Sequence, residues 1–201
     1  MQISQHPGPV EKAWPERNVC TGIVLHSMEG GADAAMHMLD GNPAVSWHYS
    51  VLKGGTILQH YADSVSCWHA GSKAQNLRLI GIEHEGKAGD PLTPAQLASS
   101  VALVRELCRV HGLPMSRVNG NKTLWEHNEV PGAATTCPNG RIPWEAYVPE
   151  YPVNTNIADG FDAGLARIHA LNAARSSIRA FRQAFGNPAD MKRLVDEVFD
   201  E

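Results

Sequence analysis

Residues 92–114, LTPAQLASSVALVRELCRVHGLP, place the strongest constraint on the fold, because they carry the start and stop signals of one long helix. Thr93 is a favourable N-cap, Pro94 suits the first helical position, and Gln96 is placed to complete a capping box. Gly112, with a proline two residues later, ends the helix. Apolar side chains recur three or four residues apart and give the predicted helix one face to bury. They are Leu97, Val101, Val104, Leu107 and Cys108.

Shorter segments before this helix predict strands and one further helix. Residues 21–28 form an apolar run with β-branched side chains, which predicts a strand ending near His26. Residues 31–41 have helical spacing and a closing glycine, whereas residues 46–62 predict two strands joined through a glycine pair. Residues 78–86 predict another strand. This alternation of strands and helices indicates a mixed α/β domain.

We expect this domain to end near residue 147, where a Pro-containing segment begins. Residues 148–201 are rich in Ala and Arg, and their apolar residues fall at helical spacing. They predict a linker followed by a helical segment, to which no chemistry is assigned.

The composition excludes several classes of partner. Hydrophobic residues make up 43% and charged residues 19% of the chain, as in an ordinary globular protein. The net charge of −4 and the scattered Lys and Arg argue against nucleic acid as a partner. No apolar run is long enough to span a bilayer. The N-terminus lacks the apolar segment of a secretory signal, so we expect synthesis in a cytoplasm and export by another route.

The four cysteines are too sparse for a disulfide framework. Cys108 lies in the predicted long helix and is expected to be a buried thiol. Cys20 and Cys67 are expected to be buried thiols as well, with a bridge between them as the open alternative.

Cys137 differs, because it shares the loop-like segment of residues 123–140, TLWEHNEVPGAATTCPNG, with His127. Zinc takes imidazole nitrogen and thiolate sulfur, and a catalytic zinc site has three protein ligands and an open position. His26, at the end of a predicted strand, is a candidate for the third ligand. The alternative is a hydrogen-bonded histidine at a strand end.

Six short motifs give this chain a resemblance to a known family. They are IVLHSM, SWHYSVLKGGTI, WHAGS, IGIEHEG, LTPAQ and HNEV…TTCP, in this order. Together they resemble the zinc-dependent N-acetylmuramoyl-L-alanine amidases, which include phage endolysins and are similar to the animal peptidoglycan-recognition proteins. The resemblance covers about residues 19–147. It implies a central mixed β-sheet flanked by helices, with the metal in a surface groove, and a catalytic domain over residues 1–147. Residues 148–201 lie outside the resemblance and keep only the prediction of a linker and a helical segment.

The resemblance also implies the chemistry of the site. His26, His127 and Cys137 match the ligands of one catalytic zinc ion. The reaction would be hydrolysis of the amide between N-acetylmuramic acid and the first L-alanine of the peptidoglycan stem peptide. Glu83 matches the carboxylate that exchanges a proton with the zinc-activated water. Glu85 is the alternative carboxylate on the same strand.

Two positions depart from the family's pattern. Trp47 stands where many phage members have Tyr, and an indole can donate but not accept a hydrogen bond. Thr135 stands where several members have Lys, as it does in the recognition proteins, and is expected to stabilise the tetrahedral intermediate. His69 and Trp68 are expected to contact the substrate along with Trp47. For His69 a backbone-capping role is the alternative, and for Trp68 a place in the core.

Alternative functions remain open at this level. A non-catalytic peptidoglycan-binding module would typically lack the thiolate ligand, which this chain keeps. A structural zinc site would need a fourth ligand. A cytosolic amidase that recycles wall fragments would carry the same residues as a phage endolysin that reaches the wall after release. The trailing segment after the linker and the variation at Trp47 and Thr135 favour the endolysin.

Overall fold

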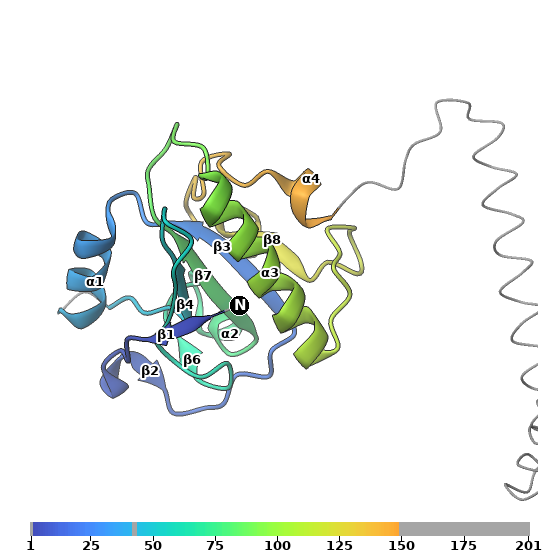
Figure 1. Cartoon of the computed structure of the whole chain (residues 1–201). Coiled ribbons are helices and arrows are strands. Elements are labelled where there is room, and N and C mark those ends of the chain that lie inside the picture. The colour runs from blue at the N-terminus through green and yellow to red at the C-terminus, as the bar shows by residue number, and fades with distance from the viewer. Residues whose placement is uncertain (1, 42–43, 149–201) are drawn as a thin grey trace, which may run out of the picture. The chain divides into compact units, whose positions relative to one another are not determined.

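The computed structural model describes residues 2–41 and 44–148, which form a mixed six-stranded sheet with helices packed on it (Figure 1). The sheet order is β1-β5-β4-β7-β3-β8. Its strands are β1 (Ile3–Gln5), β3 (Gly22–Ser27), β4 (Tyr49–Val51), β5 (Ile57–Gln59), β7 (Leu79–His84) and β8 (Leu124–Glu126). Only β4 and β5 pair antiparallel, and the other neighbours pair parallel. The predicted fold class, a mixed sheet flanked by helices, is confirmed.

The centre of the sheet is the parallel pair β3 and β7. Both strands are buried on their two faces, as expected for a parallel strand covered by helices. Side chains alternate between the faces. Ile23 and Leu25 of β3 therefore belong to the main core together with the long helix, whereas Val24 packs on the opposite side. His26, two residues after Val24, lies on the same face of the sheet as Val24.

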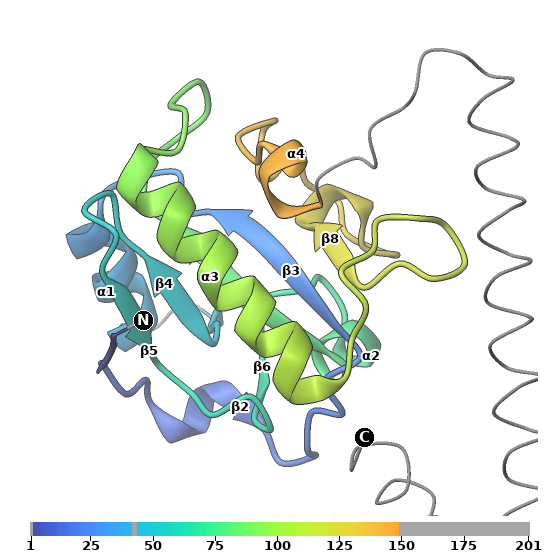
Figure 2. The same ribbon diagram turned by 45° about the vertical axis from the view of Figure 1, so that its right-hand side comes forward.

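The long helix is α3 (Pro94–His111), which lies across one face of the sheet (Figures 1 and 2). Thr93 caps it by accepting a hydrogen bond from the Gln96 amide, and Gly112 ends it in the left-handed conformation. The predicted capping box is wrong in its second half. The Gln96 side chain is fully buried and donates instead to the carbonyls of Val51 and Glu85, which fastens the helix to the sheet.

The remaining elements are short. They are the helices α1 (Ala32–Asp40), α2 (Lys73–Asn76) and α4 (Trp144–Tyr147), the 3-10 turns η1 (Val10–Lys12) and η2 (His127–Glu129), and a small sheet of β2 (Ala13–Trp14) and β6 (Ser66–Cys67). All four cysteines are free thiols, so the alternative of a Cys20–Cys67 disulfide is wrong.

Two predictions concern what lies beyond this fold. Among the described residues, no helix combines the length and the apolar character needed to cross a bilayer. Residues 149–201 lie outside the described part of the chain, so the linker and helical segment expected beyond residue 147 stay predictions.

Candidate metal site and catalytic centre

His26 and Glu83 lie side by side on the two central strands. They are opposite one another in the parallel register of β3 and β7, on the sheet face turned away from α3. The His26 imidazole is 2% exposed, and its Nδ1 lies 3.9 Å from Glu83 Oε1. The strand pairing fixes the backbone positions from which both side chains project.

His127 and Cys137 reach the same point from two loops that are tied together. His127 begins η2, directly after β8, and the amide of Asn128 donates to the Cys137 carbonyl over 2.9 Å. The Cys137 amide donates to Thr135 Oγ1, and its Sγ accepts from the Ser27 amide at 3.3 Å. The backbone and sulfur of Cys137 are therefore all held.

The ligand atoms of His26, His127 and Cys137 lie within 4.8 Å of one another. Cys137 Sγ is 3.9 Å from His26 Nδ1. In a tetrahedral site with ordinary Zn–S and Zn–N bond lengths the two atoms would be about 3.6 Å apart. The three residues thus form a donor set that fits a zinc ion with an open fourth position.

His69 fixes the orientation of His26. Its Nε2 lies 3.1 Å from the Leu79 carbonyl, which can only accept, so Nε2 carries the proton and Nδ1 is an acceptor. His26 Nε2 donates to that Nδ1 over 3.1 Å, which leaves the lone pair of His26 Nδ1 directed towards Cys137. Both nitrogens of His69 are thereby engaged within the protein. Its predicted role as a substrate contact stays a prediction, and the geometry favours a positioning role.

Gly81 makes room for His69. A Cβ at this position would come within 2.7 Å of the His69 ring atoms Cγ and Nδ1. The glycine of the IGIE motif is therefore required by close packing, which reasoning from strand patterns alone did not find.

The two candidate carboxylates have different surroundings. Glu83 lines the cavity beside the ligands, and its Oε2 is buried with no partner among the described residues. Glu85 accepts hydrogen bonds from the amides of Ala32 and Lys53 and does not line the cavity. Of the two, Glu83 is the carboxylate available to a substrate.

Burial controls the acid–base properties of the site. It raises the pKa of Glu83 to about 8, with a contribution from the charge of Glu29. Burial, followed by the neighbouring His69, holds the pKa of His26 well below its ordinary value. Burial also raises the pKa of the Cys137 thiol to about 12, with Glu83 adding to the effect. Without a cation the cluster is therefore neutral, and a bound metal ion would deprotonate the thiol.

The cavity beside the ligands has a volume of about 250 Å³. Besides the cluster and Glu83, its walls include Trp47, Trp68, His69 and two residues of α1, Ala35 and Met38. Trp47 is 5% exposed and donates from Nε1 to Ser50 Oγ. Thr135 is not among the lining residues.

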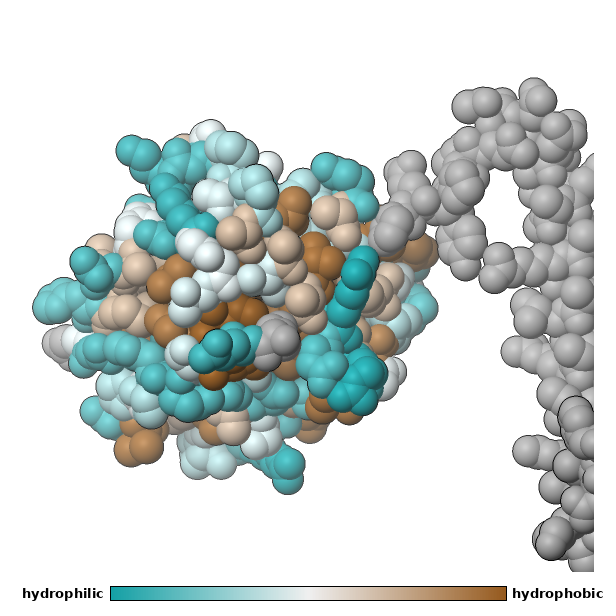
Figure 3. Space-filling view, viewed as in Figure 1, coloured by the Kyte–Doolittle hydropathy of each residue, from teal (hydrophilic) through white to brown (hydrophobic). Residues whose placement is uncertain are grey.

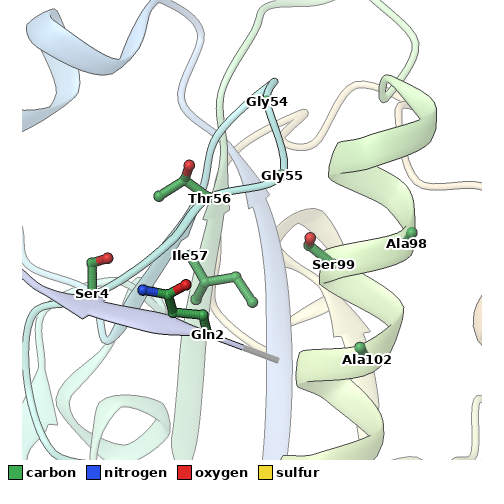
Figure 4. Close-up of a pocket in the computed structure, with 9 residues that line it drawn as sticks. All are labelled: Gln2, Ser4, Gly54, Gly55, Thr56, Ile57, Ala98, Ser99 and Ala102. Carbon is green, nitrogen blue, oxygen red and sulfur yellow. The ribbon is translucent and has the colours of Figure 1, made fainter.

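A second cavity, of about 590 Å³, lies between the turn of the β4–β5 hairpin, β1 and α3 (Figure 4). Its lining of small and uncharged residues includes Ser4, Gly55, Thr56 and Ser99 and offers no titratable side chain. The cavity beside the β4–β5 turn therefore carries no catalytic group. On the face seen in Figure 3, apolar side chains gather near the centre and hydrophilic ones lie around them.

Glu129 follows His127 by two residues and stabilises the turn that carries it. Its carboxylate pairs with Arg117 and Lys122 and accepts from the Glu126 amide, which closes a capping box over η2. It therefore holds the turn that carries His127 and does not contact an imidazole.

Comparison with known proteins agrees with this geometry. Residues 16–140 match the family model described as N-acetylmuramoyl-L-alanine amidase. The chain is 32% identical over 100 residues to N-acetylmuramoyl-L-alanine amidase A of Achromobacter lyticus, covering 48% of this chain and 55% of that protein. It is 23% identical over 138 residues to endolysin 2638A of Staphylococcus phage 2638A, covering 63% and 27% respectively.

Solved structures give the same result. The catalytic domain of XlyA superposes with a TM-score of 0.57 at 26% identity, covering 73% of this chain and 97% of that domain. The chain spans about half or less of the length of the two curated relatives, whereas it covers nearly all of this domain. The resemblance read from the six motifs is confirmed, and the chain belongs to the N-acetylmuramoyl-L-alanine amidase family.

Proposed function

We propose that this chain hydrolyses the amide bond between N-acetylmuramic acid and the L-alanine of the stem peptide in bacterial peptidoglycan. The observation that carries the proposal is the convergence of His26, His127 and Cys137 in one cavity beside Glu83, whose Oε2 has no partner among the described residues. Family membership supplies the bond that is cut.

One zinc ion is the metal that this donor set fits, and His26, His127 and Cys137 would hold it. A zinc ion supplies Lewis-acid chemistry, because it acidifies water and polarises a carbonyl. The chain's own contribution begins with orientation. His69 presents the His26 lone pair, and the amides of Ser27 and Asn128 hold the sulfur and the loop of Cys137.

Glu83 moves the proton. Its Oε2 accepts the proton of the attacking water as the water oxygen bonds to the lactyl carbonyl carbon. It then gives that proton to the alanine nitrogen as the C–N bond breaks, so the products are a carboxyl group and a free amine. We assign Trp47, Trp68 and His69 to the walls that seat the substrate. The role of Thr135, whose hydroxyl would donate to the developing oxyanion, stays a prediction, because Thr135 does not line this cavity.

The complete ligand set and Glu83 favour an enzyme over a non-catalytic wall-binding module. The likeness to a phage endolysin supports a lytic role, in which the protein acts on the wall after release from the cytoplasm. Recycling of wall fragments is the alternative. A lytic enzyme should cut intact walls at least as fast as soluble muramoyl peptides, whereas a recycling enzyme should prefer the soluble fragments.

The test is the clearing of a purified cell-wall suspension together with an assay of newly exposed N-terminal alanine. We expect the suspension to clear while new N-terminal alanine amines appear in proportion. A chelator should abolish both effects, and added zinc should restore them. Clearing that exposes reducing sugars and no alanine would assign the protein to another class of wall hydrolase.

The metal is tested separately from activity. Elemental analysis should find one zinc per chain, and cobalt substitution should give a thiolate-to-cobalt charge-transfer absorption. Cys137→Ser should abolish that absorption, and Cys108→Ser, which removes a buried thiol on α3 away from the site, should retain it. The charge-transfer band persisting in Cys137→Ser would remove this thiol from the ligand set.

A further inference from the structure

A separate cavity adjoins the metal cavity and shares a wall with it. It has a volume of about 370 Å³, within the range of small-molecule pockets, and Trp68 lines both cavities. Trp14 and Lys73 line it as well. The pairing of β2 with β6 brings Trp14 there, since Trp14 is opposite Ser66 in register.

Two indole rings form an apolar corner of this cavity. Trp14 and Trp68 meet edge to face at 61°, with their ring centroids 5.9 Å apart. The Nε1 atoms of both rings are buried without a partner among the described residues. Such a corner suits a flat, partly apolar ring, which can stack on one indole and abut the other.

Asn76 supplies a buried polar group to the same cavity. Its side chain is 6% exposed, and its Oδ1 accepts from the amides of His69 and Ala70 at 3.0 and 2.7 Å. These two bonds fix the amide group, so Nδ2 is the donor end. Nδ2 makes no hydrogen bond within the described residues, although Asn76 lines the cavity. The cavity therefore offers a fixed donor for a carbonyl oxygen.

Charge decides the kind of ligand. The Lys73 ammonium lies 4.5 Å from the Trp14 ring centroid, yet it is already paired with Glu16 at 2.5 Å. The local charge is thereby balanced. A neutral ligand suits this cavity better than the carboxylates of a stem peptide.

We propose that the cavity between Trp14 and Trp68 is a saccharide subsite that takes a neutral N-acetylated hexosamine of the glycan strand. The pyranose ring packs in the indole corner, and the acetamido carbonyl accepts from Asn76 Nδ2. The proposal rests on the proposed function for its substrate class. Because Asn76 also holds the backbone of His69, occupancy of the subsite is coupled directly to the residue that orients His26.

The test uses a tetramer of N-acetylglucosamine, which contains no muramoyl-alanine amide and so binds without being cut. In a two-dimensional ¹H–¹⁵N spectrum the indole signals of Trp14 and Trp68 should shift saturably. The signals of Trp125 and Trp144, which do not line this cavity, serve as internal controls. Trp14→Ala should weaken the interaction about tenfold. Asn76→Asp, which keeps the acceptor oxygen and removes the donor, should also weaken it.

Lys73→Met separates a sugar from an anionic peptide. Oligosaccharide binding should survive this substitution. Unchanged Trp14 and Trp68 signals on addition of the oligosaccharide would overturn the proposal. So would a free stem peptide that shifts both signals in wild type and fails to do so in Lys73→Met. The probe has no scissile amide, so its binding is measured independently of cleavage. Binding of the probe without cleavage of walls would contradict only the proposed function. Cleavage of walls without binding of the probe would contradict only the subsite.

Discussion

The Nε2 atom of His26 lies 3.1 Å from the Nδ1 atom of His69, and this contact determines which nitrogen of His26 faces Cys137. The Leu79 carbonyl sets the tautomer of His69, and His69 then sets that of His26. The lone pair of His26 that faces Cys137 is therefore fixed from the backbone of β7.

Removing this contact should weaken metal binding. His69→Phe keeps a ring of similar size and loses both hydrogen bonds, so zinc affinity should fall by about 10–100-fold in competition with a chromophoric chelator. Gly81→Ala should have the same effect, because its Cβ would displace the His69 ring. His111→Phe, at an imidazole that pairs with Asp63 away from the site, is the control. Equal zinc affinity in all three variants would show that His69 does not orient the ligand.

Glu83 should carry the proton transfer and Glu85 should not. Glu83→Gln is nearly isosteric, so it should retain zinc and lower the turnover on purified walls by about 10²–10⁴. Glu85→Gln should change turnover little, since its oxygens accept hydrogen bonds from backbone amides outside the cavity. The comparison requires zinc content to be measured on the same samples. A large loss confined to Glu85→Gln would reverse the assignment.

Stability should fall as the pH drops from 6.5 towards 4. Burial lowers the pKa of His48, His60 and His84 from 6.5 to about 4. In this window the unfolded chain binds protons that the folded chain does not, so acid favours unfolding. Each group should cost on the order of 1–2 kcal/mol at pH 5. Well above pH 6.5 the pH dependence from these three groups disappears, because the unfolded histidines are then neutral as well.

The structural reason is clearest at His48, whose Nε2–H donates to the Val65 carbonyl and whose Nδ1 accepts from the Gly81 amide. A proton on Nδ1 would break the second bond. Urea unfolding with chelator present should therefore show a smaller pH slope for His48→Gln than for wild type. His37→Gln, at an exposed position, should keep the wild-type slope. These pKa values set a window of about pH 4.5 to 6.5 for the effect. An unfolding free energy that does not change with pH in this window would contradict this account.

Arg141 should be a major source of stability near the site. It is 5% exposed, and its guanidinium donates to Ser27 Oγ and to the carbonyls of His84, Glu85 and Asp90. Arg141→Leu removes all four of these charge-assisted hydrogen bonds. The carbonyls of His84 and Glu85 keep one other donor each, from Met28 and Gln96, so the free energy of unfolding should fall by about 3 kcal/mol, mainly through the lost bonds. Arg109→Leu, which removes an exposed pair with Glu106, should have a much smaller effect. Similar midpoints for both variants in urea would argue against the role of Arg141.

Much of the fold and of the candidate site follows from local sequence. Four elements occur where hydrophobic periodicity and turn residues predict them. They are the strand that ends next to His26, the hairpin within residues 46–62, the strand within residues 78–86 and the helix capped by Thr93. These signals are local, because they depend on side chains a few residues apart. Spacing alone did not select the metal ligands. The ordered motifs named them, and the fold then brought the three together.

Other features depended on which segments meet in space. Gln96 looked like half of a capping box, and its buried amide instead donates to the carbonyls of Val51 and Glu85, which lie 45 and 11 residues away in the sequence. The motif named Glu83, with Glu85 as the alternative on the same strand. Their surroundings differ, because Glu83 lines the cavity whereas Glu85 accepts from the amides of Ala32 and Lys53. The strands β2, β6 and β8 contain two or three residues each and carry too little pattern to predict.

The sequence by itself therefore determined the long helix, the central strands and, through the family motifs, the chemical identity of the site. The tertiary structure decided which carboxylate faces the ligands, which way His26 points and why residue 81 is glycine. The physical reason is that a hydrogen bond or a close contact between distant segments is specified by the arrangement of the whole sheet, which no short stretch of the chain encodes.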